Sequence, residues 1–384
     1  MSKSNKCIAC RNDLNFEQIL SIGTLPFYYG IKNENIESDL RDHNLAADLL
    51  TCHNCGLIQQ VISGKRLAAL DSLYQGYSSD VSTPMSDTGW GRERVKVFFK
   101  NVSFLFRPYS AVEIGCQNGY LLYELSNMGA EKLYGVEPSL QVPYSKNGFK
   151  AKIYKEFFNP NRFKGKIFDT VLALWVLEHT EYPVKFLKSV SKVLKKDGQL
   201  IITVPNAKGQ IAAGDPGLFI HEHLGYYTET SLRNIFSIAG YRIVELNITE
   251  RDYYITATKS NNLSKIVPMP DNNILAEYEK RLKNLLTRFK RKLLHKKRLG
   301  LWGACATTAN LIKLSELTEY VVFDSDSAKY GNEISGINGV VMKPTKSNLR
   351  RMADYICIAP YGPTDSIKRI LQEEGIRSFG LFEG

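Results

Sequence analysis

The middle of the chain alternates short apolar runs with longer segments whose apolar residues recur at helical spacing. Short apolar runs bounded by turn residues are typical of strands, and the longer amphipathic segments are typical of the helices that cover them. This alternation predicts an α/β fold with helices on both faces of a largely parallel sheet. The last two runs are close together, so we expect an antiparallel hairpin at one edge. The strand-like runs are 111–115, 132–138, 168–179, 198–206, 241–248 and 253–259.

Other patterns frame this core and divide the chain into four predicted regions. Two cysteine pairs mark an N-terminal module, and a stretch with Pro and Asn followed by a basic amphipathic segment predicts a linker and a solvated helix. Strand-like and helix-like segments then return and predict a second Rossmann-like α/β domain. There, Gly300, Gly303 and Asp324 have dinucleotide-like spacing without a third glycine, so we expect a structural scaffold that helps to hold a substrate. The regions are 1–70, 71–260, 261–297 and 298–384.

Length and charge narrow the classes of partner. A chain of 384 residues is long enough for two or three domains. It carries 50 Lys and Arg against 39 Asp and Glu, which gives a formal charge of +11. That excess suits an anionic small molecule, a nucleic acid or an acidic membrane surface, or it is only a solvated basic surface. Nothing in the pattern indicates an oligomeric state.

Hydropathy and cysteine content bear on the location of the protein. No apolar run approaches the roughly 20 residues that cross a bilayer, and no apolar stretch follows the charged N-terminus. We therefore expect no membrane span and no signal peptide. Seven cysteines are too sparse for a secreted disulfide scaffold, so a cytoplasmic protein with reduced thiols is expected.

Four of the cysteines form two Cys-x-x-Cys pairs, which are Cys7, Cys10, Cys52 and Cys55. Thiolates at this spacing suit a tetrahedral zinc ion held by two tight turns. A redox pair and chance are the alternatives. His43 and His53 could offer nitrogen, but four thiolates already complete the shell. A closed shell of this kind predicts a structural zinc ion, because no position stays open for water.

A glycine-containing turn follows the first predicted strand, in the segment VEIGCQNG. Gly115 and Gly119 there would let a ligand approach the backbone closely. Glu113 ends the strand, and Glu137 lies 22 residues after Gly115 at the end of the next one. A carboxylate in that place can accept both hydroxyls of a ribose. The absent third glycine disfavours NAD, and a purely structural turn is the alternative.

The segment HEHLGYY contains His221, Glu222 and His223, whose residue types suggest acid–base chemistry. Imidazole titrates near neutrality and can exchange a proton with a substrate. Metal binding is disfavoured because adjacent strand-like positions point to opposite faces. An unreactive histidine is the alternative. Upstream, Tyr74 and Tyr77 could donate to a developing oxyanion or only pack against a neighbouring domain.

These motifs together resemble the class I S-adenosylmethionine-dependent methyltransferases over roughly residues 85–260. In that family the glycine turn cradles the amino-acid part of the cofactor and the acidic residue holds the ribose. The rings at 157 and 158 fall where the family often contacts adenine, although ordinary core packing is equally consistent with them. The resemblance implies S-adenosylmethionine as cofactor and a binding set of Glu113, Gly115, Gly119, Glu137, Phe157, Phe158 and Trp175.

The whole chain resembles the bacterial nucleotide-sugar C-methyltransferases. The resemblance lies in CHNCGLIQQ, GTLPF, YSSDVS, HEHL and the C-terminal segments LWGACATTANLI and YVVFDSDSAKYGNEISG. It implies methylation of a nucleotide-linked 4-keto deoxysugar at carbon 3 through an enolate, in surface polysaccharide or deoxysugar biosynthesis. The nucleotide sugar would be the partner, with no stable nucleic-acid complex.

The same resemblance implies roles for individual residues. His223 would be the base, Glu222 its orienting partner and Tyr77 a hydrogen-bond donor, with His221 beside them. The family pattern Tyr-His-Glu-His begins here with Ile220. O- and N-methylation of a small molecule therefore stay open beside C-methylation.

Two other functions also stay open. Zinc-bearing N-termini joined to this core occur among RNA methyltransferases, and a charge of +11 fits phosphate binding, although RNA binding gives no reason for the second α/β domain. A non-catalytic protein of methyltransferase descent is the third hypothesis. The intact glycine turn and Glu137 argue against it.

Overall fold

The structure, a computed structural model, divides the chain into two compact units. The first contains residues 1–19, 50–206 and 222–271, and the second contains 20–49, 207–221 and 272–384. These units differ from the predicted regions, because residues 1–70 are shared between both and 207–221 belong to the second. The structure describes residues 6–15, 18–31, 44–76, 85–139, 142–146, 148–262, 265–268, 274–293, 298–362 and 364–383.

The first unit contains a seven-stranded sheet in the order β10–β11–β8–β7–β4–β5–β6. Neighbours from β8 to β6 are parallel, whereas β11 is antiparallel to both β8 and β10. The predicted parallel core and the antiparallel hairpin are thus confirmed, with β11 inserted next to β8. The strands are β4 (Ser110–Ile114), β5 (Lys132–Val136), β6 (Lys152–Tyr154), β7 (Phe168–Leu174), β8 (Leu194–Pro205), β10 (Tyr241–Ile248) and β11 (Asp252–Lys259).

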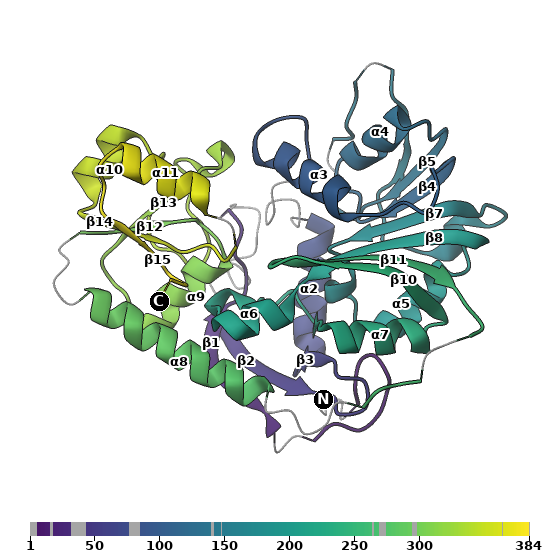
Figure 1. The fold of residues 1–384 in the computed structure, drawn as a ribbon, viewed down its shortest axis with the longest axis horizontal. Coiled ribbons are helices and arrows are strands. Elements are labelled where there is room, and N and C mark those ends of the chain that lie inside the picture. Colours follow the sequence, from purple (N-terminus) through teal and green to yellow (C-terminus); the bar gives the residue numbers. More distant parts are fainter. Residues whose placement is uncertain are drawn as a thin grey trace. The chain divides into compact units, whose positions relative to one another are not determined.

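Helices cover both faces of this sheet. Figure 1 shows α3 (Gly89–Asn101) and α4 (Tyr120–Asn127) on one side, and α5 (Pro183–Val190) and α7 (Glu229–Ile238) on the other. Phe98 of α3 and Leu121 of α4 share one apolar cluster with strand residues such as Leu172. Successive strand residues point to opposite faces, so buried strands such as β7 supply apolar side chains to both layers.

The second unit contains a four-stranded parallel sheet in the order β13–β12–β14–β15, as the predicted second α/β fold requires. Its strands are β13 (Val321–Phe323), β12 (Leu299–Trp302), β14 (Tyr355–Ile358) and β15 (Ser378–Gly380). One face of this sheet, which includes Leu301, packs against α8 (Ile274–Leu293) and α9 (Ala306–Ser315). Trp302 and the opposite face pack with α10 (Lys346–Met352) and α11 (Asp365–Glu373).

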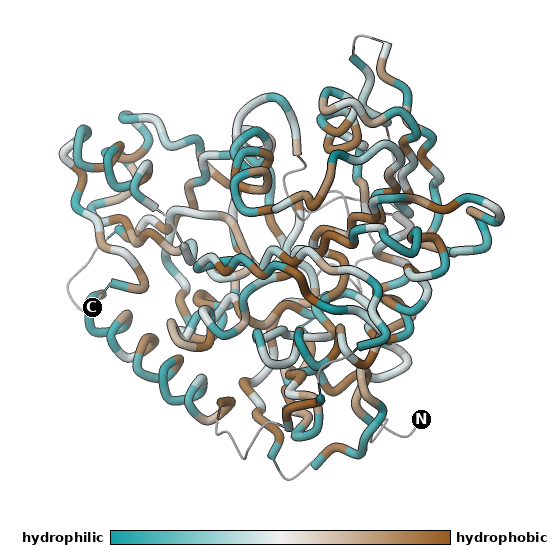
Figure 2. Tube along the Cα trace, turned by 45° about the vertical axis from the view of Figure 1, so that its right-hand side comes forward, coloured by the Kyte–Doolittle hydropathy of each residue, from teal (hydrophilic) through white to brown (hydrophobic). Residues whose placement is uncertain are grey.

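Helix α8 is the basic helix predicted from the sequence, but it is more than a solvated connector. It buries one stripe of apolar residues, and it alternates between hydrophilic and hydrophobic positions in Figure 2. Spacings of three and four residues keep these side chains on one face of a helix. Its charged residues occupy the rest of its surface. The buried residues are Leu275, Tyr278, Leu282, Leu285 and Phe289.

Short elements complete the described fold. The strand β1 (Leu20–Pro26) pairs with β2 (Asn44–Thr51), and β3 (Ile58–Gln60) pairs with β9 (Gly225–Tyr226), both antiparallel. The helices α2 (Gly64–Gly76) and α6 (Ala207–Ala213) and the 3₁₀ turns η3 (Pro160–Phe163), η4 (Leu177–His179), η5 (Pro216–Leu218) and η6 (Ser327–Lys329) connect the larger elements. Among the helices of the described ranges, none has the length and apolar character needed to cross a bilayer.

A buried amide is one of the groups that tie residues 207–221 to the second unit. The Asn310 side chain on α9 donates to the carbonyl oxygens of Pro216 (2.8 Å) and Phe219 (3.0 Å) and accepts from the Tyr29 hydroxyl (2.9 Å). These bonds join three stretches that are distant in the sequence. Buried polar groups left without partners cost free energy, so the three stretches are stabilised together.

We predict that Asn310→Leu lowers the free energy of unfolding by about 2–4 kcal/mol, because it removes three buried hydrogen bonds. Urea unfolding followed by far-UV circular dichroism measures the loss. The control is Asn332→Ala, which removes one exposed hydrogen bond to Ala328 and should change the midpoint little. Equal midpoints for both variants would contradict the role given to Asn310.

Candidate functional site

The glycine turn lies where β4 ends and α4 begins. Gly115 and Gly119 have φ angles of +73° and +84°, which side chains rarely adopt. A Cβ on Gly115 would lie 2.6 Å from a methyl of Val176, and one on Gly119 would lie 2.7 Å from a methyl of Ile153. The turn therefore requires glycine for its conformation and for space. It also packs directly against the segment that follows β7.

Glu137, at the end of β5, is held beside this turn. Its carboxylate accepts hydrogen bonds from the Gln117 amide (2.9 Å) and from the Ser139 amide and hydroxyl (3.0 and 2.7 Å). A carboxylate offers about four lone-pair sites, and these bonds use three of them. One site is left for a ribose hydroxyl, fewer than the two bonds that the sequence interpretation assigned to it. Its role in ribose binding stays a prediction.

Glu113, on β4, is a buried carboxyl group. Within the part of the chain that the structure describes, its Oε2 atom has no hydrogen-bond partner. Burial raises the pKa of Glu113 well above its usual range, and the charge of Glu137 adds to this. Buried polar atoms are nearly always paired, so the orphaned oxygen suits the ammonium group of an amino-acid ligand. Together with the glycine turn and Glu137, it fits S-adenosylmethionine.

Trp175 begins the segment after β7 in a conformation that is unusual for a side-chain-bearing residue, with φ of 54°. Its indole N–H donates to Asp252 (2.9 Å), and the Arg94 guanidinium lies 4.3 Å from the ring centroid. Burial lowers the pKa of Arg94 to about 10, and Asp252 opposes that shift. The indole is thus fixed by two charged groups and orders the start of the loop that continues to His179.

The two phenylalanines predicted near the adenine differ in their surroundings. Phe158 packs against Phe163 and Phe186, with ring centroids 6.4 and 6.0 Å apart. Phe157 is 46% exposed. Core packing therefore accounts for Phe158, whereas Phe157 remains accessible to a ligand.

The residues of the HEH segment lie in different surroundings. His221 is fully buried in the second unit, where its ring packs against Phe27 and Phe219 and its Nε2 lies 3.1 Å from the Leu25 carbonyl oxygen. These contacts are those of a core histidine, the alternative that its sequence context allowed. Glu222 and His223 belong to the first unit. Tyr77 lies outside the described residues.

His223 is grouped instead with a histidine that the sequence analysis did not select. Its ring stands edge-on to that of His179, with centroids 4.8 Å apart. The Nδ1 atom of His179 lies 2.6 Å from the Tyr74 hydroxyl and 3.1 Å from the Glu222 carbonyl oxygen. The available signal was the position of LEH after a strand parallel to β4, because neighbouring strands end at one edge of the sheet. We call Tyr74, Glu178, His179, Glu222 and His223 the histidine cluster.

Burial sets the protonation of this cluster. It lowers the pKa of His179 to about 4, although 24% of that side chain is accessible, and holds the pKa of His223 well below its usual value. It raises the pKa of Glu222 to about 7, against the stabilising hydrogen bond from Tyr74. Both imidazoles are thus neutral near pH 7, and each keeps a nitrogen lone pair.

The backbone of His223 is held by the end of β3. Gln60 donates from Nε2 to the His223 carbonyl oxygen (2.6 Å), and its own amide oxygen accepts from Arg66 (2.7 Å). Gln60 is buried and lies five residues after Cys55. The turn that contains Cys52 and Cys55 is therefore linked to the histidine cluster by β3 and the hydrogen bond from Gln60 to His223.

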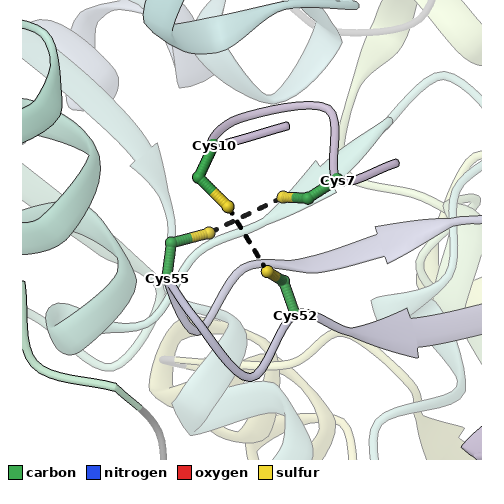
Figure 3. Close-up of side chains that lie close together, drawn as sticks. All are labelled: Cys7, Cys10, Cys52 and Cys55. Carbon is green, nitrogen blue, oxygen red and sulfur yellow. Dashed lines mark hydrogen bonds between the residues drawn. The ribbon is translucent and has the colours of Figure 1, made fainter. Parts of the chain in front are cut away.

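The four paired cysteines converge, as Figure 3 shows. The sulfurs of Cys7 and Cys55 are 3.6 Å apart and those of Cys10 and Cys52 are 3.5 Å apart, and all four lie within 4.8 Å of one another. A disulfide would require about 2.05 Å. Four thiolates around one zinc ion, with bonds of about 2.3 Å, lie about 3.8 Å apart. The geometry fits a tetrahedral ion.

The two cysteine turns have the same local construction. The residue after each pair, Arg11 or Gly56, has a positive φ angle (65° and 75°). Interaction with Cys10 is the largest cause that raises the thiol pKa of both Cys7 and Cys55. Four neighbouring thiols cannot all ionise without a compensating cation, and a divalent ion would supply that charge.

The glycines and the acidic residue of the second α/β domain serve packing. Asp324 accepts hydrogen bonds from the amides of Ala304 (2.7 Å) and Asp326 (2.8 Å) and pairs with Lys329 (3.1 Å). A Cβ on Gly303 would lie 2.5 Å from the Pro360 ring. These contacts agree with the structural scaffold expected there.

Comparison with known proteins identifies the core. Residues 90–246 match a family model described as "Methyltransferase domain". The chain is 29% identical over 160 residues to a "tRNA U34 carboxymethyltransferase" of Campylobacter hominis, which covers 39% of this chain and 53% of that protein. It is 38% identical over 122 residues to the protein of that name from Sulfurovum sp., covering 30% and 40%. The chain spans about half, or less, of the length of these curated relatives.

The solved structures that the chain matches are more distant in sequence. One is a putative S-adenosylmethionine-dependent methyltransferase from Listeria monocytogenes, with 14% identity, a TM-score of 0.35, and coverage of 43% of this chain and 97% of that one. Another is the Burkholderia thailandensis 1,6-didemethyltoxoflavin-N1-methyltransferase with bound S-adenosylhomocysteine. It has 14% identity and a TM-score of 0.37, and covers 53% of this chain and 96% of that one.

These relatives correct the function predicted from the sequence. Methylation of a nucleotide-linked 4-keto sugar, with its place in deoxysugar biosynthesis, was wrong, because the curated relatives are named for tRNA. The motifs that suggested sugar chemistry lie largely in the cysteine-rich N-terminus and the C-terminal domain, outside residues 90–246. The RNA-directed alternative is the better supported one.

We predict that Gly119→Ala weakens binding of S-adenosylhomocysteine at least tenfold, because its Cβ would lie 2.7 Å from the Ile153 methyl in a backbone conformation that disfavours side chains, so the turn and Ile153 must rearrange. Isothermal titration calorimetry measures the affinity. The matched control is Gly129→Ala, past the other end of α4, where φ is +98° but the space is open. Unchanged affinity in Gly119→Ala, or equal losses in both variants, would exclude this turn as the cofactor cradle.

The parallel core with an antiparallel hairpin at one edge, the glycine turn at the end of β4, and the family match over residues 90–246 all agree with the core predicted from the sequence. The chain therefore contains a class I S-adenosylmethionine-dependent methyltransferase domain.

Proposed function

We propose that the chain is an S-adenosylmethionine-dependent transferase that alkylates a base in RNA. The observation that carries this proposal is the name shared by its curated relatives, tRNA U34 carboxymethyltransferase, at up to 38% identity. The excess of basic residues supports an anionic acceptor. The earlier expectation of no stable nucleic-acid partner is replaced by this proposal.

An exposed basic segment beside the glycine turn supports an RNA acceptor. Residues 150–166 contain one acidic residue, Glu156, which pairs with Arg162 at 2.5 Å. The segment begins just before the edge strand β6 and includes it, and Ile153 of β6 packs against Gly119. Exposed lysines and arginines interleaved with aromatic rings are typical of nucleic-acid-binding surfaces. We call this set the basic strip, and it contains Lys150, Lys152, Lys155, Arg162, Lys164 and Lys166.

The histidine cluster supplies the chemistry at the acceptor. Two of its members, Glu178 and His179, follow closely after Val176, whose methyl group packs against the glycine turn at Gly115. The neutral imidazoles of His179 and His223 offer lone pairs that can withdraw a proton from a nucleobase or orient its reacting oxygen or nitrogen. S-adenosylmethionine, when bound, supplies an electrophilic carbon. Gln60 holds the His223 backbone in place during this step.

We predict that His223→Ala lowers the rate of transfer to tRNA about 10²–10⁴-fold, the usual loss when an acid–base group is removed. The assay follows S-adenosylmethionine labelled on the transferable carbon into bulk tRNA, with nuclease digestion to locate the label in a nucleoside. Binding of S-adenosylhomocysteine to the variant should be unchanged. Label that enters only small-molecule acceptors would overturn the RNA proposal and favour O- or N-methylation of a metabolite.

We also predict that Lys155→Ala/Lys164→Ala/Lys166→Ala weakens tRNA binding and flattens its salt dependence. Each lost phosphate contact reduces the slope of log K against log salt by about 0.7–0.9. The matched control, Lys280→Ala/Lys283→Ala/Lys290→Ala, removes the same charge from exposed positions on α8. Filter binding at several salt concentrations measures both. Equal losses in the two triple variants would show a response to net charge and refute the basic strip.

We propose further that Cys7, Cys10, Cys52 and Cys55 hold a structural zinc ion. The convergence of their sulfurs supports this, and the ion would stabilise the turn that precedes β3 and Gln60. Its loss should therefore disturb the histidine cluster more than the cofactor turn.

Cys52→Ser should remove the tightly bound zinc measured by inductively coupled plasma mass spectrometry and abolish transfer to tRNA. Binding of S-adenosylhomocysteine should remain, because the glycine turn is built from β4, β5 and α4. Cys305→Ser is the control, since Cys305 is not one of the four converging thiols. Full zinc content and activity in Cys52→Ser would contradict the proposal.

A further inference from the structure

Three side chains of the histidine cluster bring one oxygen and two nitrogen donors together. Glu178, His179 and His223 each offer a ligand atom, and these atoms all lie within 4.8 Å of one another. Glu178 and His179 come from η4, and His223 comes from the segment before β9. All three belong to the first unit and are separate from the four-cysteine group.

Glu178 is the most unusual member of this set. Glu178 is 1% exposed, and neither of its carboxylate oxygens has a hydrogen-bond partner among the residues that the structure describes. Its Oε1 lies 3.9 Å from His179 Nε2, too far for a hydrogen bond. A buried carboxylate without hydrogen bonds or a counter-charge is strongly unfavourable. A cation bound here would give both carboxylate oxygens the partner that the described protein groups do not supply.

The orientation of His179 leaves its Nε2 lone pair on the side of Glu178. Its Nδ1 lies 3.1 Å from the Glu222 carbonyl oxygen, which can only accept, and a proton on Nδ1 would bind that oxygen and leave the lone pair on Nε2. The Tyr74 hydroxyl, 2.6 Å from the same nitrogen, further fixes the ring. A histidine whose Nδ1–H is bound by a backbone carbonyl, with Nε2 free for coordination, is the arrangement found at protein metal sites.

We propose that Glu178, His179 and His223 bind a divalent transition-metal ion. Two imidazoles and one carboxylate suit zinc, iron(II), cobalt(II) or manganese(II) better than magnesium or calcium. Ligands around a tetrahedral ion with bonds of about 2.0–2.1 Å lie about 3.3 Å apart, so the 3.9 Å separation needs to close by about 0.6 Å. The ion compensates the buried charge of Glu178.

The proposed site gives the histidine cluster a defined role at the acceptor. With the ion bound, the lone pairs of His179 and His223 would go to the metal, so the ion would replace these imidazoles in promoting loss of the acceptor proton. Three protein ligands leave a coordination position open, and an acceptor oxygen there would lose its proton more readily. Tyr74 and Glu222 then act as positioning residues that hold the His179 ring. This use of the ion rests on the proposed function, whereas the binding of the ion does not.

Cobalt(II) distinguishes this site from the cysteines in the full-length protein. With the cysteine site filled by one equivalent of zinc, added cobalt should bind as a second equivalent with weak visible bands and without the intense thiolate charge-transfer absorption. Calorimetry with cobalt or manganese should show the same single site, and magnesium should bind far more weakly. Absence of a second equivalent, or a thiolate spectrum for it, would overturn the proposal.

Variants identify the ligands. Glu178→Gln and His223→Ala should each weaken binding of the second equivalent more than 100-fold, whereas Glu181→Gln, a neighbouring carboxylate outside the cluster, should bind like the unmodified protein. Tyr74→Phe should weaken binding of the second equivalent about 10–100-fold, as expected for a residue that orients a metal ligand. Binding of S-adenosylhomocysteine verifies that each variant is folded. Wild-type cobalt affinity in folded Glu178→Gln or His223→Ala would overturn the assignment.

The two proposals fail separately. A second metal equivalent in a protein that does not modify tRNA would refute the RNA substrate and retain the metal site. Transfer to tRNA by a protein that binds no second equivalent would refute the metal site and retain the substrate.

Discussion

Val176 packs against Gly115, and this contact joins the two halves of the site. Gly115 follows β4 and Val176 follows β7, and the two strands are parallel neighbours in the sheet. The glycine turn, which is the proposed cofactor cradle, and the loop that contains Glu178 and His179 therefore lie at the same edge of the sheet. A class I fold places donor and acceptor chemistry together in this way without needing residues that are close in sequence.

Much of the fold could be predicted from hydrophobic periodicity, because six of the seven strands of the core coincide with apolar runs; the short edge strand β6 was not among the predicted runs. The insertion of β11 beside β8 was not specified locally, since the sequence predicted only a hairpin. Helix α8 illustrates another limit. Its dense charge indicated solvent exposure, yet spacings of three and four residues bury Leu282 and Leu285 on one face. The surface of a helix can be highly basic while one stripe forms part of a core.

Some parts of the site could be predicted from the sequence and others could not, because local sequence specifies only short motifs. The cysteine pairs and the glycine turn are short motifs, so their geometry follows from neighbouring residues. The histidine cluster depends on contacts between residues more than 40 positions apart, such as His179 with Glu222. His221 and His223 are two positions apart, but only His223 joins that cluster. Its neighbour packs against Phe27 and Phe219, an outcome set by tertiary structure that local spacing does not reveal.

An experimental structure of the protein with S-adenosylhomocysteine tests the central claim most directly, because its sulfur atom marks the place from which the alkyl group leaves. The predicted result is a ligand in the turn at Gly115 and Gly119, with the sulfur facing the space bounded by His179 and His223. A sulfur that faces away from these histidines, or a ligand bound elsewhere, would contradict the assignment of the histidine cluster to the acceptor.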